Sequence, residues 1–295
     1  MENILNYIIA GLANGCIYSL VAIGFVLIYK SSGILNFAQG TIVILNAFVF
    51  YSFTIQLGIP MVIAILLTLA FGALLGFVIE RFILDRLIGQ PILAVIILTL
   101  AFSEFLKGIM NLGWGTDILS APQLFPRGNI TILNIVTLDY SRIAFLVITF
   151  FLIIIFAIFY NKTKIGLAMK ATSDDTIAAG SVGIRVRRVF VVTWIISCIT
   201  AAAGGILVTN VMGIHIQVAE IGFKAMAVAL VGGLQSLPGI IIIGPAMGII
   251  EFLSAAYLDP LVDGGMRDLV PFIILLIVLI FRPSGIFGWK HIERI

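Results

Sequence analysis

The chain has 295 residues, of which 61% are hydrophobic and only 11% are charged, and its mean hydropathy is +1.22. Soluble domains carry about 25% charged residues, so this composition excludes a soluble globular protein. The net charge of +3 argues against nucleic-acid binding. Cys16 and Cys198 both lie inside apolar runs, and they predict neither a disulfide nor a metal site.

Continuous apolar runs predict helices that cross a membrane. A spanning helix needs about 20 apolar residues, and the runs here lack the alternating pattern of a membrane β-barrel. The first run has no basic flank and no clear cleavage site, so we read it as a retained span. The expected spans cover residues 5–29, 35–55, 61–79, 92–112, 143–160, 189–211, 240–257 and 269–281.

One further apolar stretch, residues 222–234, is too short to span comfortably. The sequence Gly232 to Gly239 then predicts a break in the helix. Irregular backbone is tolerated at membrane depth only where it is buried in protein or lines a cavity. We therefore predict an all-α fold, a polytopic transmembrane helical bundle of about 8–9 spans with one broken helix, forming a single domain over residues 1–295.

Residues 161–188 form the only long polar stretch and hold six of the 17 basic residues. Lys164 to Ala171 predicts a short helix. Ser173 is expected to N-cap a second short helix, with Asp174 and Asp175 in its first turn, where the helix dipole favours negative charge.

The second short helix is predicted to be amphipathic. Ile177, Ala178 and Val182 fall close to one face, and Gly180 and Gly183 are natural stops for the helix. A loop kept in the cytoplasm only by its charges is the simpler interpretation. Because such a loop needs no helices, we favour a docking surface for a soluble partner.

The distribution of Lys and Arg predicts the orientation. With residues 161–188 placed in the cytoplasm, twelve of the 17 basic residues are cytoplasmic and five are not. This arrangement puts the N-terminus outside and the C-terminus inside. It needs an odd number of crossings, which requires residues 222–234 to count as a crossing or as half of a broken helix.

Polar residues inside spans are costly in hydrocarbon and point to function. Glu251 is the deepest carboxylate, and structural pairing and a role in a translocation path are both open for it. With the glycines of the predicted break, the candidate path residues are Asn14, Asn36, Gln39, Asn46, Gly232, Gly233 and Glu251. No P-loop, paired histidines or nucleophile motif occurs, so we expect no ATP hydrolysis or other catalysis by this chain.

Several motifs together resemble one known family. They are Gly15–Gly24, Gly33–Gly40, Val78–Arg81, Trp114-Gly115, Gly166–Val186, Leu230–Gly239 and Phe281–Gly288. In this order and over nearly the whole chain, they resemble the LivH-like permeases of bacterial branched-chain amino acid ABC importers, which are type II ABC importer permeases. Gln39 departs from the pattern, which more often has His there, and this puts a proton-linked role for the position in doubt.

The resemblance implies a bacterial inner-membrane location, and it implies that residues 161–188 dock into a cytoplasmic ATPase. It implies a homologous companion permease in a heterodimer, two cytoplasmic ATP-binding cassette subunits and an extracytoplasmic substrate-binding protein. ATP would be bound by the partner ATPase, and no cofactor by this chain. The residues assigned to coupling on this basis are Lys170, Ser173, Asp174, Asp175, Ile177, Ala178 and Gly183.

Three alternatives stay open. A urea or short-amide permease would share the same motifs. A secondary transporter acting alone would need an ion site in the spans, for which Glu251 is the only serious candidate. A membrane enzyme is the most distant alternative, because no nucleophile, base and metal ligand converge in the sequence.

Overall fold

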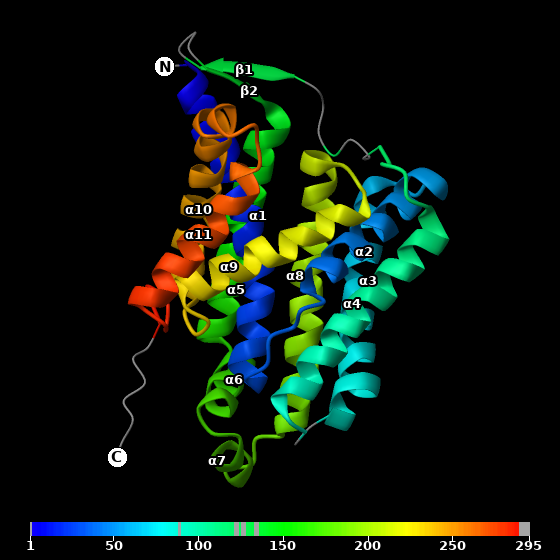
Figure 1. Cartoon of the computed structure of the whole chain (residues 1–295). Helices are drawn as coiled ribbons and strands as arrows, with labels where there is room; N and C mark the ends of the chain where they lie inside the picture. Colours follow the sequence, from blue (N-terminus) through cyan, green and yellow to red (C-terminus); the bar gives the residue numbers. More distant parts are fainter. Residues whose placement is uncertain (1, 88–89, 121–123, 125–127, 133–135, 289–295) are drawn as a thin grey trace. The chain divides into compact units, whose positions relative to one another are not determined.

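The computed structural model describes residues 2–87, 90–120, 124, 128–132 and 136–288 (Figure 1). The last seven residues of the predicted domain, 289–295, lie outside the described residues. Nearly all of the described chain is helical, as the apolar runs predicted. The first five helices are α1 (Glu2–Ser32), α2 (Gln39–Tyr51), α3 (Met61–Val78), α4 (Ile92–Trp114) and α5 (Tyr140–Lys162).

The remaining helices follow the predicted order. They are α6 (Lys164–Asp174), α7 (Thr176–Ser181), α8 (Val186–Met212), α9 (Ile221–Gly232), α10 (Leu237–Tyr257) and α11 (Met266–Phe281). Shorter pieces continue or connect them: π-helical turns at Ser52–Gln56 and Ile79–Leu84, and 3₁₀ turns at Asp85–Leu87, Ile216–Glu220 and Asp259–Leu261.

Six described helical segments are long and apolar enough to cross a membrane. They are Ile4–Ser32, Met61–Leu84, Ile92–Trp114, Ile143–Lys162, Val186–Met212 and Leu237–Leu261. The predicted spans at 35–55 and 269–281 correspond to shorter helices, namely α2 with its π-helical turn and the 16-residue α11. These lengths support a membrane-spanning helical protein but leave the total of 8–9 spans a prediction.

Two details differ from the sequence prediction. A two-stranded antiparallel hairpin, β1 (Asn129–Ile132) paired with β2 (Val136–Asp139), lies between the predicted spans 92–112 and 143–160, where no strand was predicted. The second span begins at Gln39 and not at residue 35. Its start is delayed because the Asn36 side chain accepts a hydrogen bond from the Ala38 amide, which holds a local turn that competes with a helix.

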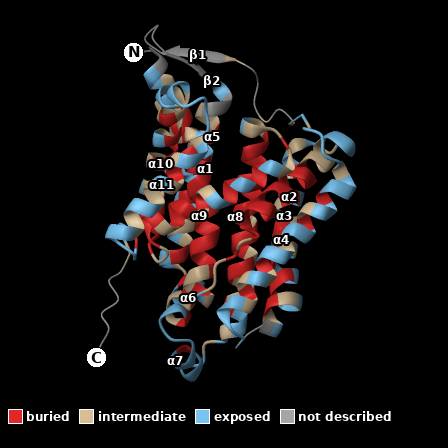
Figure 2. Ribbon diagram, in the orientation of Figure 1, coloured by how far each residue is buried: buried red, intermediate tan, exposed pale blue. Residues whose placement is uncertain are grey.

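The chain divides into two compact units, which we describe separately. One contains residues 23–124 and 155–222. In it α8 packs against α2 and α3, and α2 also packs against α4. Figure 2 shows α2 and much of α8 as buried. Close approach of α3 and α8 needs a residue without a side chain, because a Cβ atom on Gly72 would lie 2.9 Å from the Cβ of Ala202.

The other unit contains residues 1–22, 125–154 and 223–295. Here α10 packs along α11, and the two helices run side by side in Figure 1. The first part of α1 packs on α10 through glycines, since a Cβ atom on Gly11 would lie 2.6 Å from the Gly248 carbonyl oxygen. Lipid provides no hydrophobic drive between helices, so such close backbone approach stabilises a membrane bundle. The glycine pairs at 11/15 and 244/248 thus act in packing.

Candidate functional site

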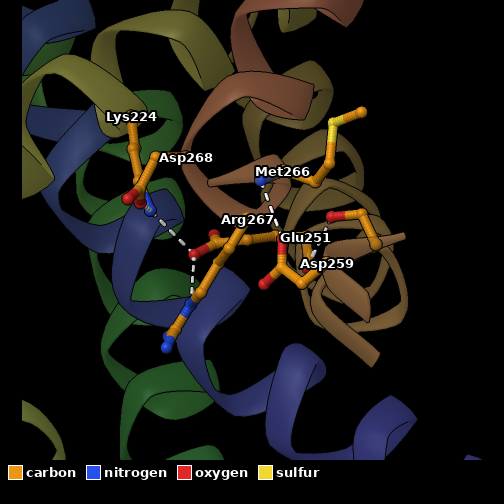
Figure 3. A network of polar contacts seen from close by, with 7 residues as sticks. Lys224, Glu251, Asp259, Met266, Arg267 and Asp268 are labelled. Carbon is orange, nitrogen blue, oxygen red and sulfur yellow. Dashed lines mark hydrogen bonds and ion pairs between the residues drawn. The ribbon is translucent and has the colours of Figure 1, made fainter. Parts of the chain in front are cut away.

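An ion cluster around the buried Glu251 joins α9, α10 and α11 of the second unit (Figure 3). The side chain of Glu251 is fully buried in α10, and its Oε1 accepts hydrogen bonds from two cations. Lys224 Nζ of α9 lies 2.8 Å away, and Arg267 Nε of α11 lies 3.1 Å away. Lys224 Nζ also donates to Asp268 Oδ1 at 2.7 Å. One carboxylate therefore connects the first turns of α9 and α11 to α10.

The loop before α11 positions Arg267. The Oδ1 of Asp259 accepts a 2.8 Å hydrogen bond from the backbone amide of Met266, the first residue of α11. This bond satisfies one of the free amides at the helix start. The guanidinium of Arg267 also lies over the ring of Phe252, 4.7 Å from its centroid. The hydrogen bond of the preceding residue and the contact with Phe252 thus orient Arg267.

The hydroxyl of Tyr18, on α1, is buried beside Glu251 and lies within hydrogen-bonding reach of its carboxylate. Sequence reasoning selected Glu251 but missed Lys224, Arg267 and Asp268, and it used the charges of Lys224 and Arg267 only to predict orientation. Their only sequence signal was their position at span ends, which places charges near a membrane surface without naming a partner.

The predicted helix break is present between α9 and α10. Gly232 ends α9, Gly233 adopts a positive φ of 98°, and Ser236 N-caps α10 by accepting a 3.1 Å hydrogen bond from the Gly239 amide. The C-terminal segment, residues 282–288, covers this break. Its amides at Ile286 and Phe287 donate to the carbonyls of the last two residues of α9, Val231 and Gly232.

The predicted polar residues of the first two spans are buried. Gln39 Oε1 accepts from Asn36 Nδ2 at 3.1 Å and from Ser197 Oγ at 3.2 Å. Asn46 Nδ2 donates to the Ile42 carbonyl, while its Oδ1 has no partner among the described residues. The same holds for Asn14 Oδ1. The hydrogen bonds of Asn36 and Gln39 give both a structural role, and their place along a translocation path stays a prediction.

Residues 161–188 contain the two predicted short helices, but with a different cap. Asp175, not Ser173, N-caps α7, since its Oδ1 accepts from the amides of Ile177 at 2.8 Å and Ala178 at 3.0 Å. Ser173 lies inside α6, which runs three residues further than predicted. Asp175 is the cap because its carboxylate accepts hydrogen bonds from two backbone amides at once and its negative charge is favourable at a helix N-terminus.

The surface of this segment is apolar where the prediction placed a docking face. Ile177 is 81% exposed and Val182 is 78% exposed. Asp174 is also exposed, and Gly183 follows α7 with a φ of +88°. Lys170 is engaged within the chain, because its Nζ donates to Asn161 Oδ1 at 2.9 Å and lies 5.0 Å from the centre of the Tyr160 ring.

A family model described as "Branched-chain amino acid transport system / permease component" matches residues 7–279. The chain belongs to this family. It is a multi-pass membrane protein, as its relatives' names and its apolar helices indicate.

Three curated relatives cover nearly the whole chain. The permease protein BraD of the high-affinity branched-chain amino acid transport system of Pseudomonas aeruginosa is 29% identical over 99% of this chain and 98% of its own. The corresponding permease protein LivH of Escherichia coli strain K12 is 28% identical over 97% and 96%. A probable branched-chain amino acid transport permease protein LivH of Methanocaldococcus jannaschii is 29% identical over 94% and 90%.

The fold also resembles a solved structure. A chain of PsaBC from Streptococcus pneumoniae, in complex with Fab, aligns with a TM-score of 0.53 at 14% identity, covering 93% of this chain and 91% of that one. This likeness concerns the fold alone.

Proposed function

We propose that the chain is the membrane-spanning permease subunit of an ATP-driven importer for branched-chain amino acids. The family match over residues 7–279 carries this proposal. The two-helix polar segment supports it, because an importer driven by a separate ATPase needs a cytoplasmic docking element. In the complete transporter the chain pairs with a companion permease, two ATP-binding cassette subunits and an extracytoplasmic binding protein, and it binds no cofactor itself.

Coupling is assigned to α6 and α7. Ile177 and Val182 offer exposed apolar area to the ATPase, while Asp175 keeps α7 folded. Closure of the two ATPase subunits on ATP moves α7, and the permease halves open alternately to each side. Such a device works only if the ATPase contacts α7 differently in its two nucleotide states. The segment that begins at Asn161 and ends at Arg188 is thus the link between nucleotide and transport.

In this proposal the chain crosses the membrane about 8–9 times, in the bacterial inner membrane. The six long spans are joined by α2, α9 and α11, with α9 and α10 forming the broken helix. The N-terminus lies outside and the C-terminus in the cytoplasm. The path residues are those around the break and the buried polar positions of the spans.

The test is purification from the native membrane in mild detergent, followed by reconstitution into liposomes. We expect an ATPase and a second permease to co-purify, and we expect ATP-dependent uptake of leucine, isoleucine or valine when the purified binding protein is added. A complex with an inactive ATPase serves as the control. Uptake of urea or short amides in place of amino acids would overturn the assigned substrate, and uptake without any ATPase would overturn the importer assignment.

A further inference from the structure

Two neighbouring carboxylates that follow α3 are paired very unequally. Asp85 forms ion pairs with two arginines, Arg81 at 3.7 Å and Arg187 at the start of α8. Glu80 is only 1% exposed, and neither of its carboxylate oxygens has a hydrogen-bond partner among the described residues. Two cations therefore share one acceptor, while the buried acceptor near them accepts no hydrogen bond.

The same four side chains have a second arrangement available. A buried carboxylate without hydrogen bonds is unfavourable, so a fixed ion cluster would be expected to give each carboxylate one arginine. Arg187 and Arg81 both lie within electrostatic range of Glu80. If Arg187 moved from Asp85 to Glu80, Arg81 would still neutralise Asp85, and none of the four charges would lack a partner.

The cluster lies just beyond a tight contact between α3 and α8. A Cβ atom on Gly76, one turn before Glu80, would lie 2.4 Å from the carbonyl oxygen of Trp194. After this contact the chain forms the π-helical turn Ile79–Leu84, a conformation that is rare and is frequent at functional sites. The two backbones are thus held together at Gly76, whereas the Arg187 side chain, which is 55% exposed, has room to change its partner.

Arg187 is also joined closely to the proposed coupling helix. Residues 182–185 are the whole connection between α7 and α8. Within it the amide of Ile184 donates a 3.0 Å hydrogen bond to the Ala179 carbonyl of α7. Because this connection is short and hydrogen-bonded, α7 cannot move far without moving the start of α8 and, with it, Arg187.

We infer that Glu80 and Asp85 are alternative acceptors for Arg187 in the two nucleotide states of the transporter, and that this exchange passes the movement of α7 to α3. Arginine suits the role, since its guanidinium is always charged and binds a carboxylate through two parallel hydrogen bonds. Glu80 and Asp85 are thus positioning residues that act through Arg187. The inference rests on the proposed function, because it needs an ATPase that moves α7.

The test compares variants of the complete transporter in liposomes, with ATP hydrolysis and leucine uptake measured together. Glu80→Gln keeps the shape of the side chain but removes its charge. It should lower uptake per ATP hydrolysed at least about tenfold, as for loss of one charged hydrogen bond in one state. Arg187→Gln should have a similar effect, and adding Glu80→Gln to it should change the ratio less than about twofold. Glu104→Gln, at the exposed ion pair in α4, is the matched control and should leave the ratio unchanged.

Thermal midpoints distinguish an exchange of partners from a fixed contact. They are measured for the nucleotide-free complex and for the complex trapped with ATP and vanadate. Glu80→Gln should lower the midpoint in only one of these conditions, and Asp85→Asn should lower it in the other, whereas a fixed contact would be lost in both. Asp85 and Arg187 are partly exposed, so their variants test the inference even if Glu80→Gln assembles poorly.

An unchanged uptake per ATP in Glu80→Gln, or equal midpoint losses in both conditions, would overturn the inference and leave the proposed function intact. Defects of Glu80→Gln and Arg187→Gln that multiply in the double variant would also overturn it. An unmodified transporter without ATP-dependent uptake of leucine, isoleucine or valine would instead overturn the proposed function.

Discussion

The backbone amide of Ile286 donates a 2.8 Å hydrogen bond to the carbonyl of Val231. The last carbonyls of a helix have no partner inside it, and within a membrane they cannot rely on water. The C-terminal segment therefore completes the end of α9. Two motifs about fifty residues apart in sequence, at the helix break and near the C-terminus, thus form one structural element.

We predict that Gly285→Ala detaches the C-terminal segment. Gly285 has a φ of +81°, and a Cβ atom there would lie 2.6 Å from the Leu230 carbonyl oxygen. Gly264→Ala is the control, because it has a φ of +103° but no atom within 4 Å of the added Cβ. The measurement is the thermal midpoint in detergent. Gly285→Ala should lower the midpoint clearly more than Gly264→Ala, and equal effects would contradict the docking role.

Replacement of Asp175 should unfold α7 and weaken coupling. Loss of an N-cap costs about 1 kcal/mol, which is large for a helix of six residues. Asp175→Ala should increase hydrogen exchange at the amides of Ile177 and Ala178 and reduce ATP-driven uptake. Asp175→Asn retains a capping oxygen and should stay near wild type. Asp174→Ala, one residue earlier, should leave exchange in α7 unchanged, and a comparable increase there would argue against the cap.

The exposed apolar face of α7 should bind the ATPase. Ile177→Asp combined with Val182→Asp places charge on the two most exposed apolar positions of the segment and should abolish ATPase retention during purification. The protein itself should still fold, since neither side chain is buried. Ile177→Val keeps the surface apolar and is the control. Full ATPase retention by the double aspartate variant would place the docking face elsewhere.

The contact between α1 and α10 should not tolerate a side chain. Gly11→Leu would place its Cβ 2.6 Å from the Gly248 carbonyl oxygen and push two packed helices apart. We expect strongly reduced yield of folded protein by gel filtration in detergent. Gly108→Leu in α4 is the control, because no atom lies within 4 Å of its added Cβ. Similar yields from both variants would show that close packing at Gly11 is dispensable.

Loss of the Glu251 ion pairs should destabilise the packing of α9 and α11 against α10. Glu251→Ala leaves Lys224, which is 13% exposed, with only the exposed Asp268 as an acceptor, and loss of one partner of a largely buried pair costs up to about 3–5 kcal/mol. The thermal midpoint in detergent should fall well below that of Glu104→Ala, which breaks an exposed pair worth at most about 1 kcal/mol. Equal midpoints would mean that water reaches the cluster freely.

The sequence by itself determined the class of this protein and the positions of its helices. A spanning helix is specified by the length of one continuous apolar run and needs no distant contact. The starts and ends of α4 and α8 were therefore predicted within a few residues. The break at Gly232 was equally local, because two successive glycines readily leave the helical conformation and a proline is favoured in the first turn of the next helix. The apolar face of α7 followed from helical spacing alone.

Tertiary structure decided which polar groups meet. Glu251 contacts Lys224, 27 residues away, and Arg267, 16 residues away, and no periodicity links such positions. Ser173 and Asp175 have a similar propensity to cap a helix, so the sequence did not decide which of them caps α7. The docking of the C-terminal segment on α9 depends on backbone carbonyls, which every residue has and no sequence pattern marks. The contacts of Glu251 and of the C-terminal segment exist only because packed helices bring distant residues together, whereas the cap of α7 is local.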